Sequence, residues 1–345
     1  MIECCNKPES LRTIMCYRES RSEIMKCIIC GNETDNQLVS AKEMNFGFRD
    51  VFSYVECSSC HCLQISEIPE NMMKYYSASY YSFQEPRRLS KFEKFLRRRR
   101  DRYELFGESI IGFLAHLIIK SPSIASMGAK YTGIRLDSTI LDVGCGSGSL
   151  LESLYDVGLR HVTGIDPLIK TDILGDYSIF KKSIDDLPAS PMYDIIIFNH
   201  SLEHIQNQLE TLQKARKLLS ASGILIVRIP IKSEYIWARY GTNWVQLDAP
   251  RHLFLHTLLS FEILTKKSGL RIRNTVFDSN EFQFWGSEQY IRNIPLNSEK
   301  SWLVNKKQSI FSRNQIADFK RQARILNSVR EGDQATFYLE NYDSL

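Results

Sequence analysis

The sequence contains no apolar run long enough to cross a lipid bilayer. The longest candidate, residues 110–119, is about half the required length and contains His116. The opening residues, Met-Ile-Glu-Cys-Cys, lack the hydrophobic core of a secretory signal peptide. We therefore expect a cytoplasmic protein without a membrane partner.

A strong excess of charge of either sign is also missing. Lys and Arg number 44 against 40 Asp and Glu, so the formal net charge is only +4. Such a balance favours anionic partners slightly and does not by itself indicate nucleic acid. Internal repeats and low-complexity runs are absent as well. What remains is 345 residues, 43% hydrophobic and 24% charged, which suits a globular protein with two domains or one domain with large additions.

The nine cysteines favour metal binding over disulfides. One C-x-x-C pair, Cys27 and Cys30, is followed after 26 residues by a second pair, Cys57 and Cys60. Two such pairs, joined by a short β-hairpin, can place four thiolates tetrahedrally around one zinc ion. Because the protein would then fill all four positions, the zinc would be structural. We expect residues 25–70 to form a zinc ribbon, with free thiols as the alternative.

Two stretches flank this region. Residues 1–24 show little periodicity, so we expect a disordered leader, with Met25 as a candidate native start. Residues 71–130 form an aromatic and helical segment, whose tyrosines either pack the zinc ribbon on its neighbour or form a lid over a substrate. Within a helical pattern over 88–120, the basic run 97–102 is either a solvated helix face or a grip for phosphate.

The most informative stretch is a glycine-rich loop and the strand that follows it. An apolar segment over 139–143 leads into a loop over 144–148 with glycine at every second position. Glycine permits a tight turn there and lets a ligand approach the backbone closely. After a short helix, a strand over 161–165 ends at Asp166. A carboxylate about twenty residues past a glycine loop is placed to bind the hydroxyls of a ribose.

The loop spacing is G-x-G-x-G, preceded by Asp142, and not the G-x-G-x-x-G of dinucleotide-binding proteins. It resembles motif I of the class I S-adenosylmethionine-dependent methyltransferases. In that family the loop wraps the amino-acid part of the cofactor, the acid after the second strand binds the ribose, and the loop after the third strand holds the adenine. Ser183 stands where that third loop usually has an acid, so Asp185 or Asp186 would substitute. The resemblance implies S-adenosylmethionine as cofactor and these binding residues: Asp142, Gly144, Cys145, Gly146, Gly148, Asp166, Ser183, Ile184, Asp185 and Asn199.

The rest of the pattern alternates strands and helices. Residues 193–199 are nearly all apolar, as in buried parallel strands, and a further strand is expected over 223–230. This alternation predicts an α/β fold with a doubly wound, mostly parallel sheet of seven strands. Ligands bind such sheets at the carboxyl ends of the strands. The glycine loop and Asp166 both fall at that edge.

The last part of the chain is expected to complete the same sheet. Residues 334–340 alternate and can pair antiparallel with a strand over 271–277. We therefore assign residues 131–345 to one cofactor-binding domain. Residues 280–331 would then be an insertion that contains a helix over 314–329.

Candidate catalytic residues follow the strand over 193–199. The segment His200-Ser-Leu-Glu203-His204 resembles the L-E-H segment of many small-molecule methyltransferases, and not the Asn-Pro-Pro-aromatic motif that acts on the exocyclic amines of bases. Further on, Pro-Arg-His252 resembles a segment of zinc-ribbon methyltransferases that act on sugars and polyketide-like metabolites. Transfer to a hydroxyl needs a base, and histidine has a suitable pKa. The candidates are His204 or His252 as base, Glu203 as its orienting partner, and His200.

Several functional hypotheses remain open. The leading one is O- or C-methylation of a small metabolite, such as a sugar, a nucleotide-linked sugar or a glycan precursor, with nucleic acid not expected as acceptor. In a variant of it, Glu203, His204 and a distant histidine hold a divalent ion that binds vicinal hydroxyls. The second hypothesis is an RNA methyltransferase that uses the zinc ribbon and the basic helix. The third is a cofactor-binding module without catalytic activity.

Overall fold

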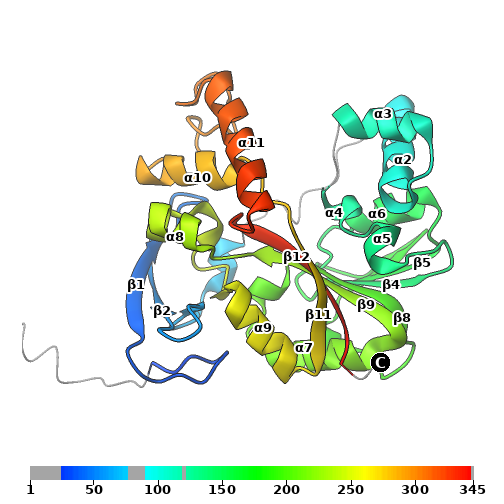
Figure 1. Cartoon of the computed structure of the whole chain (residues 1–345), viewed down its shortest axis with the longest axis horizontal. Coiled ribbons are helices and arrows are strands. Elements are labelled where there is room, and N and C mark those ends of the chain that lie inside the picture. Colours follow the sequence, from blue (N-terminus) through cyan, green and yellow to red (C-terminus); the bar gives the residue numbers. More distant parts are fainter. Residues whose placement is uncertain (1–24, 77–89, 119–121, 343–345) are drawn as a thin grey trace, which may run out of the picture.

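The computed structural model describes residues 25–76, 90–118 and 122–342. The expected leader over 1–24 lies outside these residues, as do the aromatic side chains of the expected lid between 77 and 89. In the part of the chain that is described, no helix is long and apolar enough to span a membrane. The described residues build a small four-stranded sheet and a large eight-stranded sheet (Figure 1).

The N-terminal lobe (residues 25–76) contains the small sheet, with strand order β1-β2-β3-β10. The hairpin expected between the two cysteine pairs is present, and Gln37 at its start lies opposite Glu56. The fourth strand, β10, comes from the far end of the chain and pairs antiparallel with β3. The lobe is therefore completed by residues of the cofactor domain. Its elements are β1 (Gln37–Lys42), β2 (Val51–Glu56), β3 (Leu63–Ile65), η1 (Met72–Tyr75) and β10 (Phe254–Leu255).

The large sheet has the order β11-β12-β9-β8-β4-β5-β7-β6. The doubly wound, mostly parallel α/β architecture is confirmed: β7, β5, β4, β8 and β9 run parallel, and β12 lies antiparallel between β9 and β11. The seven expected strands are joined by a two-residue edge strand, β6. The strands are β4 (Thr139–Val143), β5 (His161–Ile165), β6 (Ile173–Leu174), β7 (Ser178–Phe180), β8 (Tyr193–Asn199), β9 (Leu219–Pro230), β11 (Leu270–Phe277) and β12 (Gln334–Asn341).

Both faces of this sheet are buried, because side chains alternate between two hydrophobic cores. In β8, Ile195 and Ile197 belong to one core, whereas Ile196 and Phe198 belong to the other. Helix α6 covers the first face, and helices α7 and α9 cover the second (Figure 1). The helices around the sheet are α4 (Pro122–Ala125), α5 (Ala129–Thr132), α6 (Ser149–Val157), α7 (Gln208–Leu218), α8 (Glu234–Tyr240) and α9 (Leu258–Lys267).

The helical pattern over 88–120 forms two helices rather than one continuous helix. Helix α2 (Lys91–Phe106) begins at a capping box between Ser90 and Glu93. It ends at Gly107, which takes a φ of +73°, a conformation that L side chains rarely adopt. The chain then reverses into α3 (Ile110–Ile118). We call this pair the α2–α3 hairpin.

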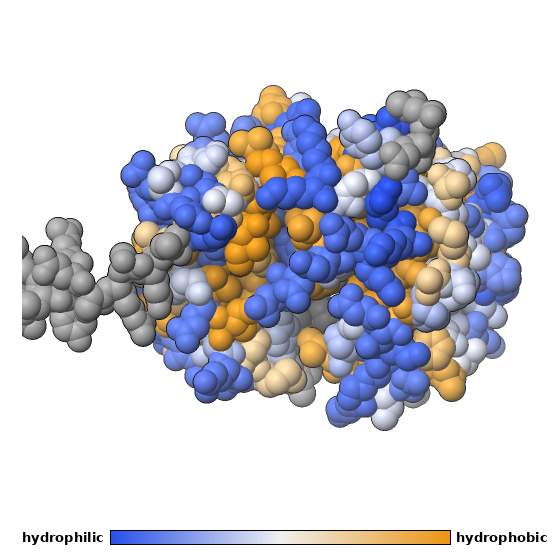
Figure 2. Space-filling model, turned by 90° about the horizontal axis from the view of Figure 1, so that it is seen from below, coloured by the Kyte–Doolittle hydropathy of each residue, from blue (hydrophilic) through white to orange (hydrophobic). Residues whose placement is uncertain are grey.

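The C-terminal insertion also holds one helix more than expected. In addition to α11 (Arg313–Ser328), the structure has α10 (Phe282–Ile291). A third core joins this insertion to the N-terminal lobe, since Met44 packs with Trp285 and Tyr290. In Figure 1, α10 lies beside α8 above the lobe, and α11 rises from the end of β12. The face seen in Figure 2 is mainly hydrophilic, with smaller apolar areas in between.

Candidate functional site

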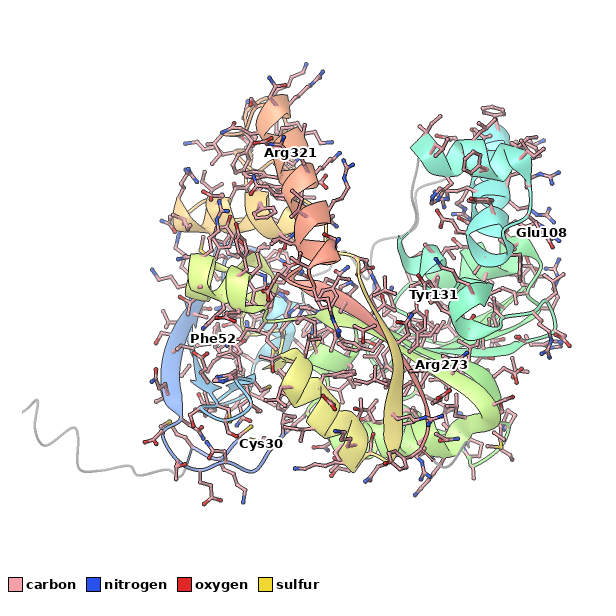
Figure 3. All side chains as sticks on the ribbon, in the orientation of Figure 1. Cys30, Phe52, Glu108, Tyr131, Arg273 and Arg321 are labelled. Atoms are coloured by element: carbon pink, nitrogen blue, oxygen red, sulfur yellow. The ribbon has the colours of Figure 1, made fainter. Side chains whose placement is uncertain are left out.

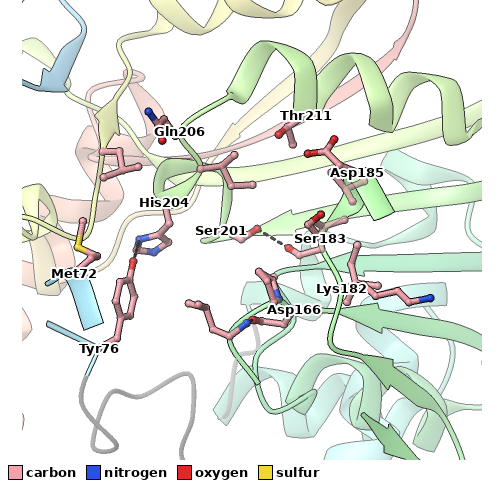
Figure 4. A pocket seen from close by; sticks show the side chains of 18 of the residues that line it. Met72, Tyr76, Asp166, Lys182, Ser183, Asp185, Ser201, His204, Gln206 and Thr211 are labelled. Carbon is pink, nitrogen blue, oxygen red and sulfur yellow. Dashed lines mark hydrogen bonds between the residues drawn. The ribbon is translucent and has the colours of Figure 1, made fainter. Parts of the chain in front are cut away.

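The first cavity, of about 500 Å³, opens at the carboxyl ends of β4, β5 and β8. This is the edge at which a doubly wound sheet binds its ligands. The structure brings seven of the expected site residues to its wall: Gly144, Asp166, Ser183, Ile184, Asp185, His200 and His204. Figure 4 shows His204 on one side of this cavity and Asp166, Ser183 and Asp185 on the other.

Five of the expected cofactor-binding residues are not part of this wall: Asp142, Cys145, Gly146, Gly148 and Asn199. They belong to the glycine loop or to the ends of the neighbouring strands β4 and β8. Gly148 has a second reason to lack a side chain, because an added Cβ would lie 2.4 Å from Cδ1 of Ile179. The close packing of Gly148 is therefore a reason for glycine that is independent of any ligand.

Gly144 shows this close packing most clearly. Its φ is +75°, and an added Cβ would lie 2.4 Å from Cβ of Ser201. The Ser201 hydroxyl in turn donates to the carbonyl of Val143 at 2.6 Å. The glycine loop is thus fixed against the segment that follows β8, so the two expected halves of the site are packed together.

Asp166 supports the loop through both of its carboxylate oxygens. Oδ2 accepts from the Gly146 amide at 2.9 Å, and Oδ1 accepts from the Leu168 amide at 2.8 Å. Each oxygen keeps a second lone pair for a ligand hydroxyl. Burial, followed by the neighbouring Asp166 carboxylate, raises the pKa of Asp142 to about 7. The glycine loop therefore lies next to two neighbouring carboxyl groups, Asp142 and Asp166, and Asp166 lines the cavity.

Asp185 and Asp186, the two acids expected to replace the missing carboxylate of the adenine loop, have different surroundings. Asp186 caps the short helix η3 (Ile184–Asp186): its Oδ2 accepts from the Ser183 amide at 2.8 Å and from the Ser183 hydroxyl at 2.9 Å. These bonds lower the pKa of Asp186. Asp185 lines the cavity instead. Of the two, Asp185 is free to meet a ligand.

The candidate catalytic residues cluster beyond this loop. His200, with a φ of +55°, directly follows β8, and η4 (Leu202–His204) carries Glu203 and His204. Oε1 of Glu203 lies 3.3 Å from Nδ1 of His200 and 3.9 Å from Nε2 of His252. One ligand atom each from Glu203, His204 and His252 lie within 4.8 Å of one another. The structure therefore brings His200, Glu203, His204 and His252 together. His204 stands 47 positions before Arg251, the direct neighbour of His252 in the sequence.

Hydrogen bonds to backbone carbonyls fix the protonation of two of these rings. Nδ1 of His204 lies 2.8 Å from the Arg251 carbonyl, and Nδ1 of His252 lies 2.7 Å from the Gln246 carbonyl. A carbonyl only accepts, so both Nδ1 atoms carry hydrogen. In the neutral imidazole, Nε2 then keeps its lone pair. Each histidine thus offers one atom for a proton or a cation.

Glu203 is buried, with 1% of its surface exposed, and within the described residues neither carboxylate oxygen receives a hydrogen bond of normal geometry. Burial raises its pKa, but the contact with His200 and the charges of the surrounding histidines outweigh this effect and hold the pKa at about 2. Burial, followed by His252, lowers the pKa of His204. At neutral pH the cluster therefore combines an ionised carboxylate with a neutral His204.

A second cavity, of about 610 Å³, lies on the other side of the cluster. His200 lines both cavities, His204 lines the first and His252 lines the second. No pattern in the sequence indicated the second cavity, because its wall comes from the lobe, from the segment before His252 and from the insertion. Its other lining residues include Asn45, Gln246, Asp248, Asn280, Phe282, Trp285, Asn297 and Gln334.

A buried ion cluster connects this wall to the N-terminal lobe, and the sequence did not reveal it. Arg251 is fully buried and contacts Asp248 at 2.5 Å and Glu43 of the lobe at 3.3 Å. The hydroxyl of Tyr54, on β2, donates to the His252 carbonyl at 2.9 Å. The lobe therefore contacts both Arg251 and His252. In this way it holds the segment whose Arg251 carbonyl meets His204.

Among the described residues of the expected lid segment, Tyr76 lines the first cavity together with Met72 and Met73. Its hydroxyl lies 3.1 Å from Nδ1 of His204 (Figure 4). Tyr75 is buried against Phe52, and its hydroxyl donates to Asp50 at 2.7 Å. Tyr75 thus packs within the lobe, whereas the adjacent Tyr76 contacts the cavity.

The four cysteines form a cluster at the tip of the lobe. Sγ of Cys27 lies 3.6 Å from Sγ of Cys60, and Sγ of Cys30 lies 3.5 Å from Sγ of Cys57. Tetrahedral thiolates about 2.3 Å from a zinc ion would be about 3.8 Å apart, so the four sulfur atoms fit such an ion with little movement. The cluster is fastened to the cofactor domain, since the hydroxyl of Thr257 donates to the Cys60 carbonyl at 2.7 Å.

Comparison with known proteins agrees with this geometry. Residues 108–275 match the family model described as "Methyltransferase domain". This region is a methyltransferase domain. The match confirms the resemblance to class I S-adenosylmethionine-dependent methyltransferases that the glycine loop suggested. It spans the strands β4 to β9 of the large sheet and reaches into β11.

The curated relatives match only about a third of this chain or less. Ubiquinone biosynthesis O-methyltransferase of Rickettsia bellii (strain OSU 85-389) is 31% identical over 126 residues, which cover 32% of this chain and 51% of that protein. The tRNA U34 carboxymethyltransferase of Shewanella sediminis (strain HAW-EB3) is 29% identical over 102 residues, 26% of this chain and 30% of that protein. The chain thus spans about half the length, or less, of these curated relatives.

Among solved structures, the cyclopropane synthase MmaA2 from Mycobacterium tuberculosis aligns with 74% of this chain and 99% of its own length. The sequence identity is 16% and the TM-score is 0.40.

Proposed function

We propose that this protein transfers a methyl group from S-adenosylmethionine to an oxygen atom of a small, polar acceptor. The observation that carries this proposal is the arrangement of two cavities that share His200, with Glu203, His204 and His252 between them. The methyltransferase-domain match supports the reaction type. In-line transfer requires the donor and the acceptor to approach from opposite sides of the transferred carbon, as two adjoining cavities allow.

The first cavity is proposed to hold the cofactor. The glycine loop over 144–148 would wrap its amino-acid part, Asp166 would bind the ribose hydroxyls, and Ser183, Ile184 and Asp185 would surround the adenine. Asp166 and Asp185 both line this cavity, in keeping with these roles.

The second cavity is proposed to hold the acceptor. Its wall combines side-chain amides, the Asp248 carboxylate and two aromatic rings, Phe282 and Trp285. Amides and carboxylates hydrogen-bond hydroxyl groups, and aromatic rings pack on the apolar face of a sugar ring. A sugar, free or nucleotide-linked, therefore remains the preferred acceptor class. The curated relatives do not support one acceptor over another, since their names refer to ubiquinone biosynthesis and to tRNA.

The acceptor hydroxyl must lose its proton as the new O–C bond forms and the S–C bond breaks. We assign the proton to Nε2 of His252, because this residue lines the acceptor cavity and Nε2 faces the ionised Glu203 at 3.9 Å. Glu203 would stabilise the imidazolium that results. The products are the methyl ether and the neutral thioether, S-adenosylhomocysteine.

A divalent cation in the cluster is the alternative. Glu203, His204 and His252 offer two lone-pair nitrogens and a carboxylate without a hydrogen bond of normal geometry among the described residues. Backbone carbonyls that accept from Nδ1, as they do in both histidines, commonly orient metal-binding imidazoles. The cation would polarise the acceptor hydroxyl, and His252 would then not be the base. Activity that survives EDTA, while the zinc content stays at one per chain, excludes this arrangement. Loss of activity that Mg²⁺ or Mn²⁺ restores would establish it.

An RNA acceptor is less well supported, because three of the five arginines in the basic run 97–102 already have carboxylate partners. Arg97 is bonded to Asp156 at 2.7 Å, Arg100 to Asp101 at 2.6 Å and Arg102 to Glu108 at 2.8 Å. These guanidinium groups would have to exchange partners before binding phosphate. An RNA enzyme predicts binding that weakens steeply with salt, whereas a small-molecule enzyme does not.

The direct test has two stages. Calorimetry of the full chain with S-adenosylmethionine and S-adenosylhomocysteine should show binding of both, and replacement of His252, which lines the second cavity and not the first, should leave that binding intact. Transfer from labelled S-adenosylmethionine to a panel of sugars, nucleotide-linked sugars, phenols and tRNA then identifies the acceptor. Absence of binding heat in folded protein would end the proposal, and binding without transfer in a cell extract would favour a non-catalytic module.

A further inference from the structure

The outer face of α3 is apolar, and the described residues leave it uncovered. The helix reads Ile-Ile-Gly-Phe-Leu-Ala-His-Leu-Ile and carries no acidic or basic side chain apart from His116. Its two ends are the most exposed, with Ile110 at 82% and Ile118 at 84%. The other exposed large apolar residues of this helix are Ile111, Phe113, Leu114 and Leu117.

The inner face of α3 is already occupied by α2. Gly112 is buried so tightly that an added Cβ would lie 2.2 Å from the Arg99 carbonyl oxygen. On the same side, Nδ1 of His116 lies 2.9 Å from Oε1 of Glu104. The hairpin therefore satisfies its small and polar residues internally and presents its large apolar residues outward. Among the described residues, nothing buries that outer face.

The adjacent helix α2 adds aromatic residues and positive charge. Phe92 and Phe95 are exposed there. Lys91, Arg98 and Arg99 are exposed too, and none of them has an ion pair with a carboxylate among the described residues. Arg99 lies instead over the ring of Phe95, 5.2 Å from its centroid. By contrast, Arg97 is committed to α6 through Asp156.

We propose that the α2–α3 hairpin docks this protein on a membrane surface that carries anionic headgroups. A helix that combines a broad apolar face with neighbouring Lys and Arg lies in the interface, with its apolar side chains among the upper acyl chains and its cations at the headgroups. The unpaired cations Lys91, Arg98 and Arg99 supply the charge that complements such a surface. At about 1.5 Å per residue, α3 is too short to span the bilayer and is suited to lie in its plane.

A second copy of this chain fits the hairpin less well. In a symmetric dimer the same patch faces itself, so the cations of α2 would lie close to their own copies across the interface. An anionic lipid surface removes this repulsion. The position of α3 agrees with a docking role, because it lies at the outer end of the hairpin, on the far side of α2 from the sheet (Figure 1). Glu108, labelled in Figure 3, marks the turn between the two helices.

The test is co-sedimentation of the full chain with vesicles, using phosphatidylcholine alone and phosphatidylcholine with phosphatidylglycerol. We expect binding to the mixed vesicles that weakens with salt. The double variants Leu114→Gln/Leu117→Gln and Arg98→Gln/Arg99→Gln should each lower the partition coefficient about tenfold or more. Both pairs are exposed, so folding should be retained.

Matched controls exist on α11 and at its end. Ile325 and Val329 are exposed to a similar degree, and Lys320 and Arg321 carry exposed charges. Ile325→Gln/Val329→Gln and Lys320→Gln/Arg321→Gln should therefore leave vesicle binding unchanged. Equal binding to neutral and anionic vesicles, or equal loss in the control variants, would overturn the proposal. A dimer that forms through the hairpin, detected by light scattering and abolished by Leu114→Gln/Leu117→Gln without vesicle binding, would replace the membrane by a second copy.

Discussion

Oε1 of Glu203 lies 3.9 Å from Nε2 of His252, and both atoms are proton acceptors when the imidazole is neutral. The bond from Nδ1 of His252 to the Gln246 carbonyl enforces this arrangement. Two facing acceptors in a buried site attract a positive charge between them. In the proposed reaction, that charge is the proton released by the acceptor.

Replacing His252 tests this role. We expect His252→Asn to lower kcat by about 100-fold or more, which is the usual contribution of a general base. Binding of S-adenosylhomocysteine, measured by calorimetry, should change by less than about twofold, because His252 lines the second cavity only. His161, which is exposed at the start of β5, provides the control variant His161→Asn. Unchanged kcat in His252→Asn would remove this residue from the chemistry.

Asp185 and Asp186 provide a matched pair for the cofactor site. Asp185→Ala should weaken S-adenosylhomocysteine binding about tenfold with little change in Tm, because this side chain lines the cavity. Asp186→Ala should instead lower the free energy of unfolding by about 1 kcal/mol, since it removes the cap of η3. Calorimetry and thermal unfolding separate the two effects. The opposite pattern would place Asp186 on the adenine.

Gly144 should not tolerate a side chain. In Gly144→Ala the new Cβ would meet Ser201 at 2.4 Å, and a φ of +75° adds backbone strain. We expect a loss of about 2–4 kcal/mol of stability, or a shifted loop that no longer binds S-adenosylhomocysteine. Gly175→Ala is the control, because no atom lies within 4 Å of its added Cβ. Denaturant unfolding and calorimetry report on both variants.

Loss of zinc should impair catalysis more than cofactor binding. The lobe holds His252 through the Tyr54 hydroxyl and contacts Arg251 through Glu43, whereas most of the cofactor cavity comes from the large sheet. We expect elemental analysis to find one zinc per chain. Cys57→Ser should lower zinc content and kcat together, while S-adenosylhomocysteine still binds. Full zinc-independent activity would show that the cysteines act as free thiols.

Asp333 should make stability depend on pH. Burial raises the pKa of this carboxyl, which accepts a bond from Nε1 of Trp244, to about 6. The folded state therefore holds this proton more tightly than the unfolded state, and stability falls as pH rises from about 4 through 6. Asp333→Asn should stabilise the protein by about 1–2 kcal/mol at pH 8 and leave it unchanged or weaker at pH 4. Thermal unfolding at the two pH values measures the difference; a gain at pH 4 alone would contradict this assignment.

Local patterns in the sequence were sufficient to predict the central architecture. The helix at 149–157 and the strands at 161–165 and 193–199 have the expected bounds, because their apolar spacing and the glycines that follow or precede them act over a few residues. The doubly wound sheet followed from their order. The break at Gly107 was missed, because apolar periodicity continues on both sides of a glycine whose left-handed conformation ends α2.

The sequence by itself determined the glycine loop, the four cysteines and the candidate histidines, since each is a short motif whose chemistry resides in its residue types. Only the tertiary structure decided that Asp185 and not Asp186 faces the cavity, and that His252 meets Glu203. It also created the second cavity, because β10 pairs with β3 and the insertion packs on Met44. Those contacts join residues far apart in the chain, and no local pattern encodes which of them will meet.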